Sequence, residues 1–225
     1  RRLSARTDCW FCLASANVEA HLVVSVGEHF YAAVPKGGMT DDHVLVVPVS
    51  CVRSRRVLPD AARRELGRYM DALSRYFASA GARVLAFERN VATRGGAGHM
   101  HVQVIPVPDA RAGDVMGVFG RECQRVGVGF QEVLGDAGLD ASGVGETDDY
   151  VYVELPVGPA GEPRRFVHVM REGERMPMQW GREMASKVLQ MPHRAHWKDC
   201  LLDASKEAVV AERFKKAFQP FDPFM

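Results

Sequence analysis

Residues 98–106 read Gly-His-Met-His-Val-Gln-Val-Ile-Pro, and the rest of the chain is organised around this stretch. Polar and apolar residues alternate as on a half-buried strand, which predicts that His99, His101 and Gln103 share one face. Two imidazoles and an amide in a row are poor core material, because each must find a hydrogen-bond partner, a metal or a ligand. The pattern therefore favours a functional site over two satisfied histidines on an edge strand.

The sequence around this stretch resembles a known family. His-x-His-x-Gln, preceded by Asn90 and a glycine-rich loop at 95–98, is similar to the histidine-triad superfamily, and the Gln in third place resembles its uridylyltransferase branch. Phe-Glu-Arg-Asn at 87–90 and Gln-Val-Ile-Pro-Val-Pro at 103–108 resemble the C-terminal region of the CwfJ family, the Cwf-nineteen-like splicing factors. The same likeness continues in residues 152–156, 179–183 and 214–222.

The resemblance implies an α+β fold in two consecutive domains. Residues 1–127 would form a histidine-triad-like antiparallel sheet with helices, and residues 128–225 a smaller α+β domain packed on it. The residue patterns themselves predict strands at 21–26, 28–34, 43–49, 83–90, 150–155 and 165–170, the last two forming a hairpin around a turn at 158–161. They predict helices at 59–80, 112–126, 178–190 and 205–218, a junction at 127–149, and a C-terminal segment at 221–225 that lies back against the domain.

Composition limits the classes of partner. A chain of 225 residues with 47% hydrophobic residues can build one large or two small domains. The net charge of +1 gives no global attraction to nucleic acid, so any such contact must be a local patch. No apolar run approaches membrane-spanning length and no signal peptide is visible, so we expect no membrane partner. The chain does not begin with Met and is expected to be a fragment of something longer.

The five cysteines indicate a metal site. An odd number in a chain of this size argues for a reducing compartment. Cys9 and Cys12 form a C-x-x-C pair, which is half a zinc site or a redox motif; we favour zinc because no thioredoxin-like unit surrounds it. In histidine-triad proteins the segment matching 43–48 is followed, three residues after its proline, by a histidine zinc ligand, and here that position is Cys51. The resemblance thus implies a structural Zn²⁺ site of Cys9, Cys12, Cys51 and His99, unless Cys51 is simply a small buried residue.

The resemblance also assigns the chemistry. His101 is the family's nucleophile, able to form a nucleotidyl-histidine intermediate with phosphorus. The other phosphate-binding or catalytic candidates are Asn90, which could instead be a turn residue, together with Arg94, Gly96, Gly98 and Gln103. Because an amide cannot act as a general acid near neutral pH, Gln103 makes hydrolysis of such an intermediate slow.

Together these features predict a nuclear factor of pre-mRNA splicing and intron-lariat turnover. It would bind RNA or nucleotide phosphate and dock on late spliceosomal proteins or the lariat debranching enzyme. Whether it is an enzyme stays open: the alternatives are an active nucleotidyl hydrolase or transferase, and a scaffold that binds no nucleotide. Trp180 and Arg182 are either base and phosphate contacts, or a packed aromatic and a surface ion pair with Glu183.

Overall fold

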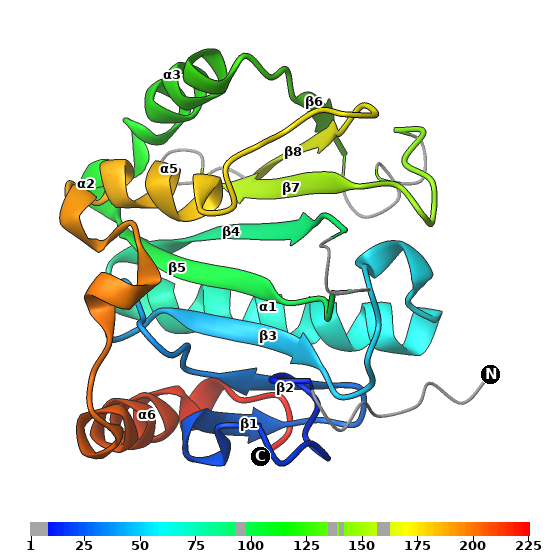
Figure 1. Ribbon diagram of the computed structural model, residues 1–225. Coiled ribbons are helices and arrows are strands. Elements are labelled where there is room, and N and C mark those ends of the chain that lie inside the picture. The colour runs from blue at the N-terminus through cyan, green and yellow to red at the C-terminus, as the bar shows by residue number, and fades with distance from the viewer. Residues whose placement is uncertain (1–8, 93–97, 135–138, 140–141, 157–162) are drawn as a thin grey trace.

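The computed structural model describes residues 9–92, 98–134, 139, 142–156 and 163–225. Within them, eight strands form one antiparallel sheet in the order β1-β2-β3-β5-β4-β7-β8-β6 (Figure 1). The strands are β1 Val23–Val26, β2 Phe30–Ala33, β3 Val44–Pro48, β4 Ala82–Asn90, β5 Val102–Pro108, β6 Gln131–Val133, β7 Tyr150–Leu155 and β8 Arg164–Val169.

The helices complete the α+β fold that the sequence predicted. They are α1 Asp60–Ser79, α2 Asp109–Ala112, α3 Val115–Val126, α5 Trp180–Val188 and α6 Ala204–Phe218, with short 3₁₀ turns η1 Ala20–Leu22, η2 Arg55–Val57, η3 Pro192–Arg194, η4 Trp197–Cys200 and η5 Gln219–Phe221. None of the helices in the described ranges combines the length and the apolar character that crossing a bilayer requires.

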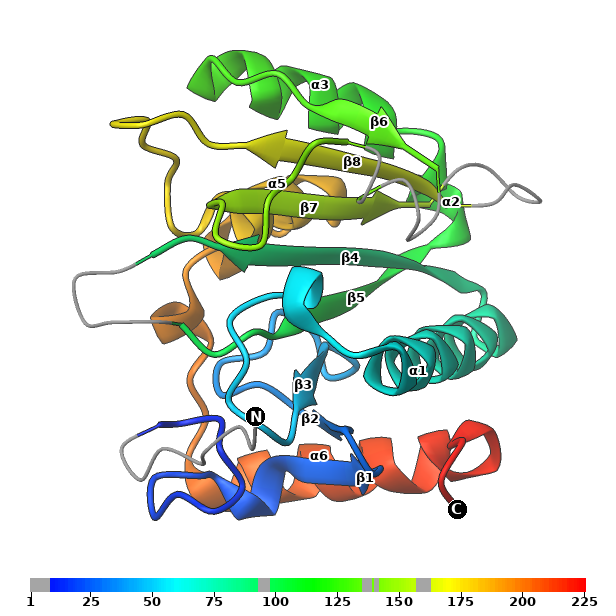
Figure 2. The same cartoon turned by 90° about the vertical axis from the view of Figure 1, so that its right-hand side faces the viewer.

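The two faces of the sheet carry different helices (Figures 1 and 2). Alternate residues of one strand enter different cores: Ala86 of β4 packs with α1 and α6, whereas Leu85 and Phe87 pack with α3 and α5. On β5, Val104 packs in the core with α1 and α6, and Ile105 packs in the core with α3 and α5. This is the period of two expected for a strand buried on both faces.

The two sequence halves meet within the sheet. β4 pairs with β5 on one side and with β7 on the other, so the strands of both halves form one continuous ladder. The predicted β7–β8 hairpin is confirmed by its pairing, while its turn at 158–161 lies outside the described residues. The division into domains at 127/128 stays a prediction.

Two local expectations change, and a third is confirmed. The predicted helix at 112–126 is two helices, α2 and α3, separated by Gly113 and Asp114. β6 lies in the stretch expected to be only a junction; it has three residues, two of them exposed, and carries too little periodicity to predict. The C-terminal segment does lie back, because Phe224 packs on Tyr69 with ring centroids 4.9 Å apart.

Candidate metal centre and adjoining cavity

The stretch that opens the candidate site is strand only in part. We expected a strand from His99, but β5 begins at Val102, and the main chain before it is held by Met100 N donating to Val52 O at 2.8 Å. The β3–β5 register runs as far as Val46 opposite Val102. Further along β3 comes Pro48, which has no N–H to give to a ladder. The residues from His99 to His101 therefore leave the sheet at its end, where side chains can turn toward other segments.

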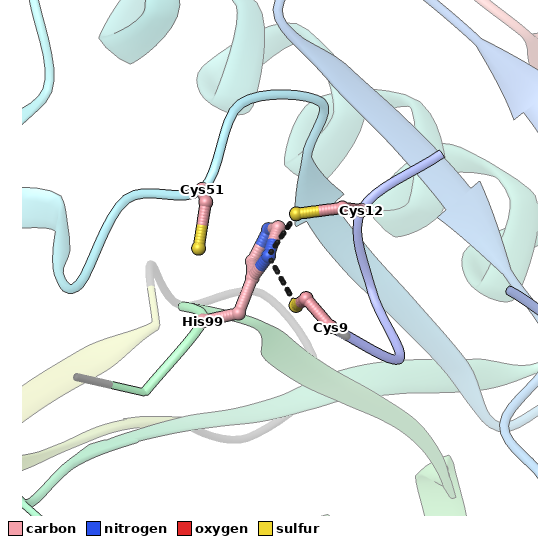
Figure 3. Close-up of side chains that lie close together, drawn as sticks. All are labelled: Cys9, Cys12, Cys51 and His99. Carbon is pink, nitrogen blue, oxygen red and sulfur yellow. Dashed lines mark hydrogen bonds between the residues drawn. The ribbon is translucent and has the colours of Figure 1, made fainter. Parts of the chain in front are cut away.

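Three cysteines and His99 converge there, as Figure 3 shows. Cys9 and Cys12 come from the segment before β1, and Cys51 from the loop after β3. One ligand atom from each of the four residues lies within 4.8 Å of all the others, so the group could hold a metal ion. His99 Nδ1 is 3.3 Å from Cys9 Sγ and 3.6 Å from Cys12 Sγ.

The donor set fits zinc. A tetrahedral ion with Zn–S near 2.3 Å and Zn–N near 2.0 Å places its ligand atoms about 3.5–3.8 Å apart. His99 Nε2 donates to Pro48 O at 2.8 Å, which leaves the Nδ1 lone pair directed at the sulfurs. Burial lowers the pKa of His99 to about 4, so the ring is neutral, as a metal ligand must be. Burial and the neighbouring thiols raise the pKa of Cys51 to about 12, so metal binding would have to displace its proton.

A cavity of about 610 Å³ adjoins the cluster on the sheet face opposite α1. One part of its wall is apolar and includes Tyr31, Leu45 and Val47. Residues from both halves contribute, since the segment 176–182 and Trp197 line the cavity as well. A cavity of this size and mixed character is typical of small-molecule sites.

His101 lies at the polar end of this cavity. Its Nδ1 donates to His99 O at 3.1 Å, and its ring stacks on Phe11 with centroids 4.7 Å apart. Burial lowers the pKa of His101, while its bond to His99 O and the charge of Glu88 act in the opposite direction. The neutral ring thus keeps its proton on Nδ1 and leaves the Nε2 lone pair available.

Gln103 also lines the cavity, and behind it lies His43, which was predicted only as the start of a strand. His43 is fully buried; its Nδ1 accepts from Met39 N at 3.1 Å, which places the ring proton on Nε2. No described atom meets hydrogen-bond geometry with that Nε2, yet the Gln103 side chain is near enough to oppose the effect of burial on the pKa of His43. The sequence carries only part of the signal: strand alternation puts His43 on one face with Leu45 and Val47. The pairing of Leu45 with Gln103, which brings His43 behind the cavity, is decided by the sheet.

The other predicted phosphate ligands lie differently. Asn90 is buried, and both ends of its amide are engaged: Oδ1 accepts from Arg53 Nε at 3.1 Å and Nδ2 donates to Asp148 O at 2.7 Å. Its phosphate role stays a prediction, and a ligand would have to compete with these bonds. Gly98 lines the cavity in a place where a methyl group would meet nothing within 4 Å. Arg94 and Gly96 lie outside the described residues.

Arg182 and Trp180 are packing residues. Arg182 donates to the carbonyl oxygens of Ala195 and Gly37 at 2.9 and 3.0 Å, and burial lowers its pKa. The expected ion pair with Glu183 is not formed, because Glu183 pairs with Arg125 instead. The Trp180 ring is 1% exposed within the core beneath α5, so stacking on a base is not open to it.

Comparison with known families gives a direct assignment. Residues 1–119 match the family described as "Protein similar to CwfJ C-terminal", and residues 132–223 match "Protein similar to CwfJ C-terminus 2". The chain belongs to the CwfJ family. The two matches follow each other in the order that the sequence resemblance predicted.

Curated CwfJ-like relatives extend well beyond the matched part. The chain is 38% identical to rice "Zinc finger CCCH domain-containing protein 59", with 99% of this chain and 36% of the relative covered. It is 37% identical to the Arabidopsis thaliana "Zinc finger CCCH domain-containing protein 64" (96% and 36%) and 36% identical to mouse "CWF19-like protein 1" (95% and 38%). The chain thus spans little more than a third of these proteins.

Proposed function

We propose that this CwfJ-family chain is a phosphate-binding module of a nuclear splicing factor. It binds RNA or a nucleotide through a histidine-triad-like cavity, and it docks on late spliceosomal proteins or on the lariat debranching enzyme. Family membership supports the splicing role and the nuclear location. The partners are inferred from the resemblance to Cwf-nineteen-like splicing factors.

One observation carries the binding proposal: His101 presents a neutral ring to the polar end of a cavity whose other end is apolar. An apolar, aromatic-lined end suits a nucleobase, and ring nitrogens and amides suit phosphate and ribose oxygens. Gln103 contributes an amide that can donate to a phosphate oxygen without changing charge.

A structural Zn²⁺ ion supports this cavity from behind. Cys9, Cys12, Cys51 and His99 would supply all four ligands and leave no open coordination position, so the ion's role is to hold three segments together. His99 O accepts from His101 Nδ1, so the metal cluster and the tautomer of His101 are joined by one hydrogen bond. The metal would therefore fix where His101 points.

The second candidate function is a nucleotidyl hydrolase or transferase with His101 as nucleophile. The observation that favours it is the tautomer: with the proton on Nδ1, Nε2 is the nitrogen that could attack phosphorus. Gln103 opposes turnover, because its amide cannot deliver a proton to a leaving group. We expect binding, and at most a slow transfer step.

Incubation with radiolabelled nucleotides tests both functions. The zinc-loaded chain is incubated with α-labelled ATP and GTP, then separated under denaturing conditions at neutral and acidic pH. An acid-labile adduct that is absent in His101→Ala identifies the enzyme. Saturable binding of nucleotide or RNA without adduct supports the module, and absence of both leaves a scaffold. His193→Ala, which changes a histidine on η3, serves as the matched control.

A further inference from the structure

The charged residues of the cavity wall differ in how they are paired. Four described residues of the wall carry a charge: Glu19, Lys36, Arg89 and Arg182. Lys36 is neutralised by Glu19 at 2.6 Å, and Arg182 is committed to backbone carbonyls. The Arg89 side chain has neither an ion pair nor a hydrogen bond among the described residues, and its buried Nε has no partner within them.

The strand register places Arg89 and His101 at the same end of the β4–β5 ladder. The pairing ends with Glu88 opposite Val102, and Arg89 and His101 are the residues next to this last pair, one on each segment. Phe87, two residues before Arg89 on β4, pairs with Gln103, and both of these residues line the cavity. Arg89 and His101, which follow at the end of this ladder, line it as well.

A half-buried guanidinium that finds no partner within the described part of the chain is costly unless something binds it. Burial lowers the pKa of Arg89, and the carboxylate of Asp149 compensates only in part. Asp149 is itself engaged by Arg53 and accepts from Ala92 N at 3.0 Å, so it is not a dedicated partner. A buried polar atom without a partner in a cavity is a reason to look for a ligand with the missing acceptor.

We propose that Arg89 is the phosphate-recognition residue of this cavity and that the ligand is a nucleoside 5′-phosphate, either free or at the end of an RNA. The guanidinium fork matches two phosphate oxygens, and the apolar end accommodates the base. The inference rests on the proposed binding function and adds a phosphate-binding residue to it. Arg89 belongs to the Phe87-Glu88-Arg89-Asn90 segment that resembles the family.

The second half of the chain shapes this site from the opposite side. A methyl group on Gly181 would come 2.4 Å from the Phe87 ring, so the start of α5 lies directly on β4. Phe87 is two residues before Arg89 on that strand. Met178 and Trp10 lie on the cavity wall and are 67% and 63% exposed. The experiment must therefore use the whole chain, since the first half alone would lack one wall.

The test compares ligands with and without the phosphate. Calorimetric titrations of the zinc-loaded chain use AMP, adenosine, and the oligonucleotide rA5 with a 5′-phosphate or a 5′-hydroxyl. We expect the wild-type chain to bind AMP at least tenfold tighter than adenosine. Arg89→Ala should remove this preference for AMP without changing the affinity for adenosine, and Arg89→Lys should keep part of the preference. Arg121→Ala, which changes an exposed arginine on α3, is the matched control. A 5′-phosphate effect in rA5 that depends on Arg89 identifies an RNA end as the ligand; an effect confined to AMP identifies free nucleotide.

Two outcomes overturn the proposal, and they are distinguishable. If Arg89→Ala keeps the full preference for AMP over adenosine, phosphate is read by another residue and the binding function stands without Arg89. If the wild-type chain binds none of the four ligands, the proposed function fails and the role of Arg89 fails with it. Thermal unfolding of each variant shows whether a loss of binding reflects a loss of fold.

Discussion

Replacing Glu88 with glutamine is expected to destabilise the fold strongly. Glu88 is 1% exposed and accepts from Arg55 Nε at 2.7 Å and from Tyr150 Oη at 2.6 Å. The substitution keeps the shape and an acceptor for Tyr150 but leaves the Arg55 charge buried. Arg55 also contacts Glu154, 3.7 Å away, and the Tyr152 ring, whose centroid is 4.0 Å from the guanidinium carbon.

The magnitude follows from the burial of both partners. Arg55 is only 6% exposed, so the case is that of a buried pair broken from one side, which costs about 3–5 kcal/mol. For a chain of this size that corresponds to a fall in Tm of roughly 6–20 °C. Because Arg55 follows the Cys51 loop while Tyr150 belongs to β7, the loss would loosen the junction between the two halves.

Urea and thermal unfolding measure the effect, and a double variant separates its causes. In Arg55→Met/Glu88→Gln the buried charge is gone, so at least half of the lost stability should return. Glu132→Gln, which removes a carboxylate from an exposed ion pair with Arg164, should leave the unfolding curve unchanged. A loss below about 1 kcal/mol in Glu88→Gln, or a double variant as unstable as the sum of its parts, would refute the reasoning.

Three further predictions concern the metal, the contact of α5 with the sheet, and pH. Elemental analysis should find one zinc per chain, and Cys51→Ser should lose it with a lower Tm; full retention would exclude Cys51 as a ligand. Gly181→Ala should cost about 1–3 kcal/mol and weaken AMP binding, because the methyl group meets the Phe87 ring, whereas Gly67→Ala, with nothing within 4 Å on α1, should stabilise by about 0.5–1 kcal/mol. Burial holds the pKa of His43 well below its usual value, so its contribution to stability is present above about pH 6.5 and is lost as the pH falls. Urea titrations at pH 7 and 5.5 measure how much the free energy of unfolding falls between these two pH values. In His43→Gln this fall should be smaller than in the wild type by about 1.4 kcal/mol, and an equal fall would contradict the prediction.

Local pattern was enough to predict most elements, and together with the family resemblance it predicted the metal cluster. The periodic apolar positions of α1 and the alternation of β4 and β7 are properties of short windows, and they report which face is buried. The cluster of Cys9, Cys12, Cys51 and His99 came from spacing and family resemblance, and the fold brings all four together. The strand β6 was missed, because its three residues hold too little pattern to predict a strand.

Only the tertiary structure decided which buried faces meet. Sequence periodicity marks a strand as buried but does not name its neighbour, so the pairing of β4 with β7 could not be read from either segment. The same limit hid the burial of Arg182 against carbonyls far along the chain and the opening of Arg89 into a cavity with one wall from each half. Hydrogen-bond partners and cavity walls are non-local, because they depend on segments that become neighbours only when the whole sheet has formed.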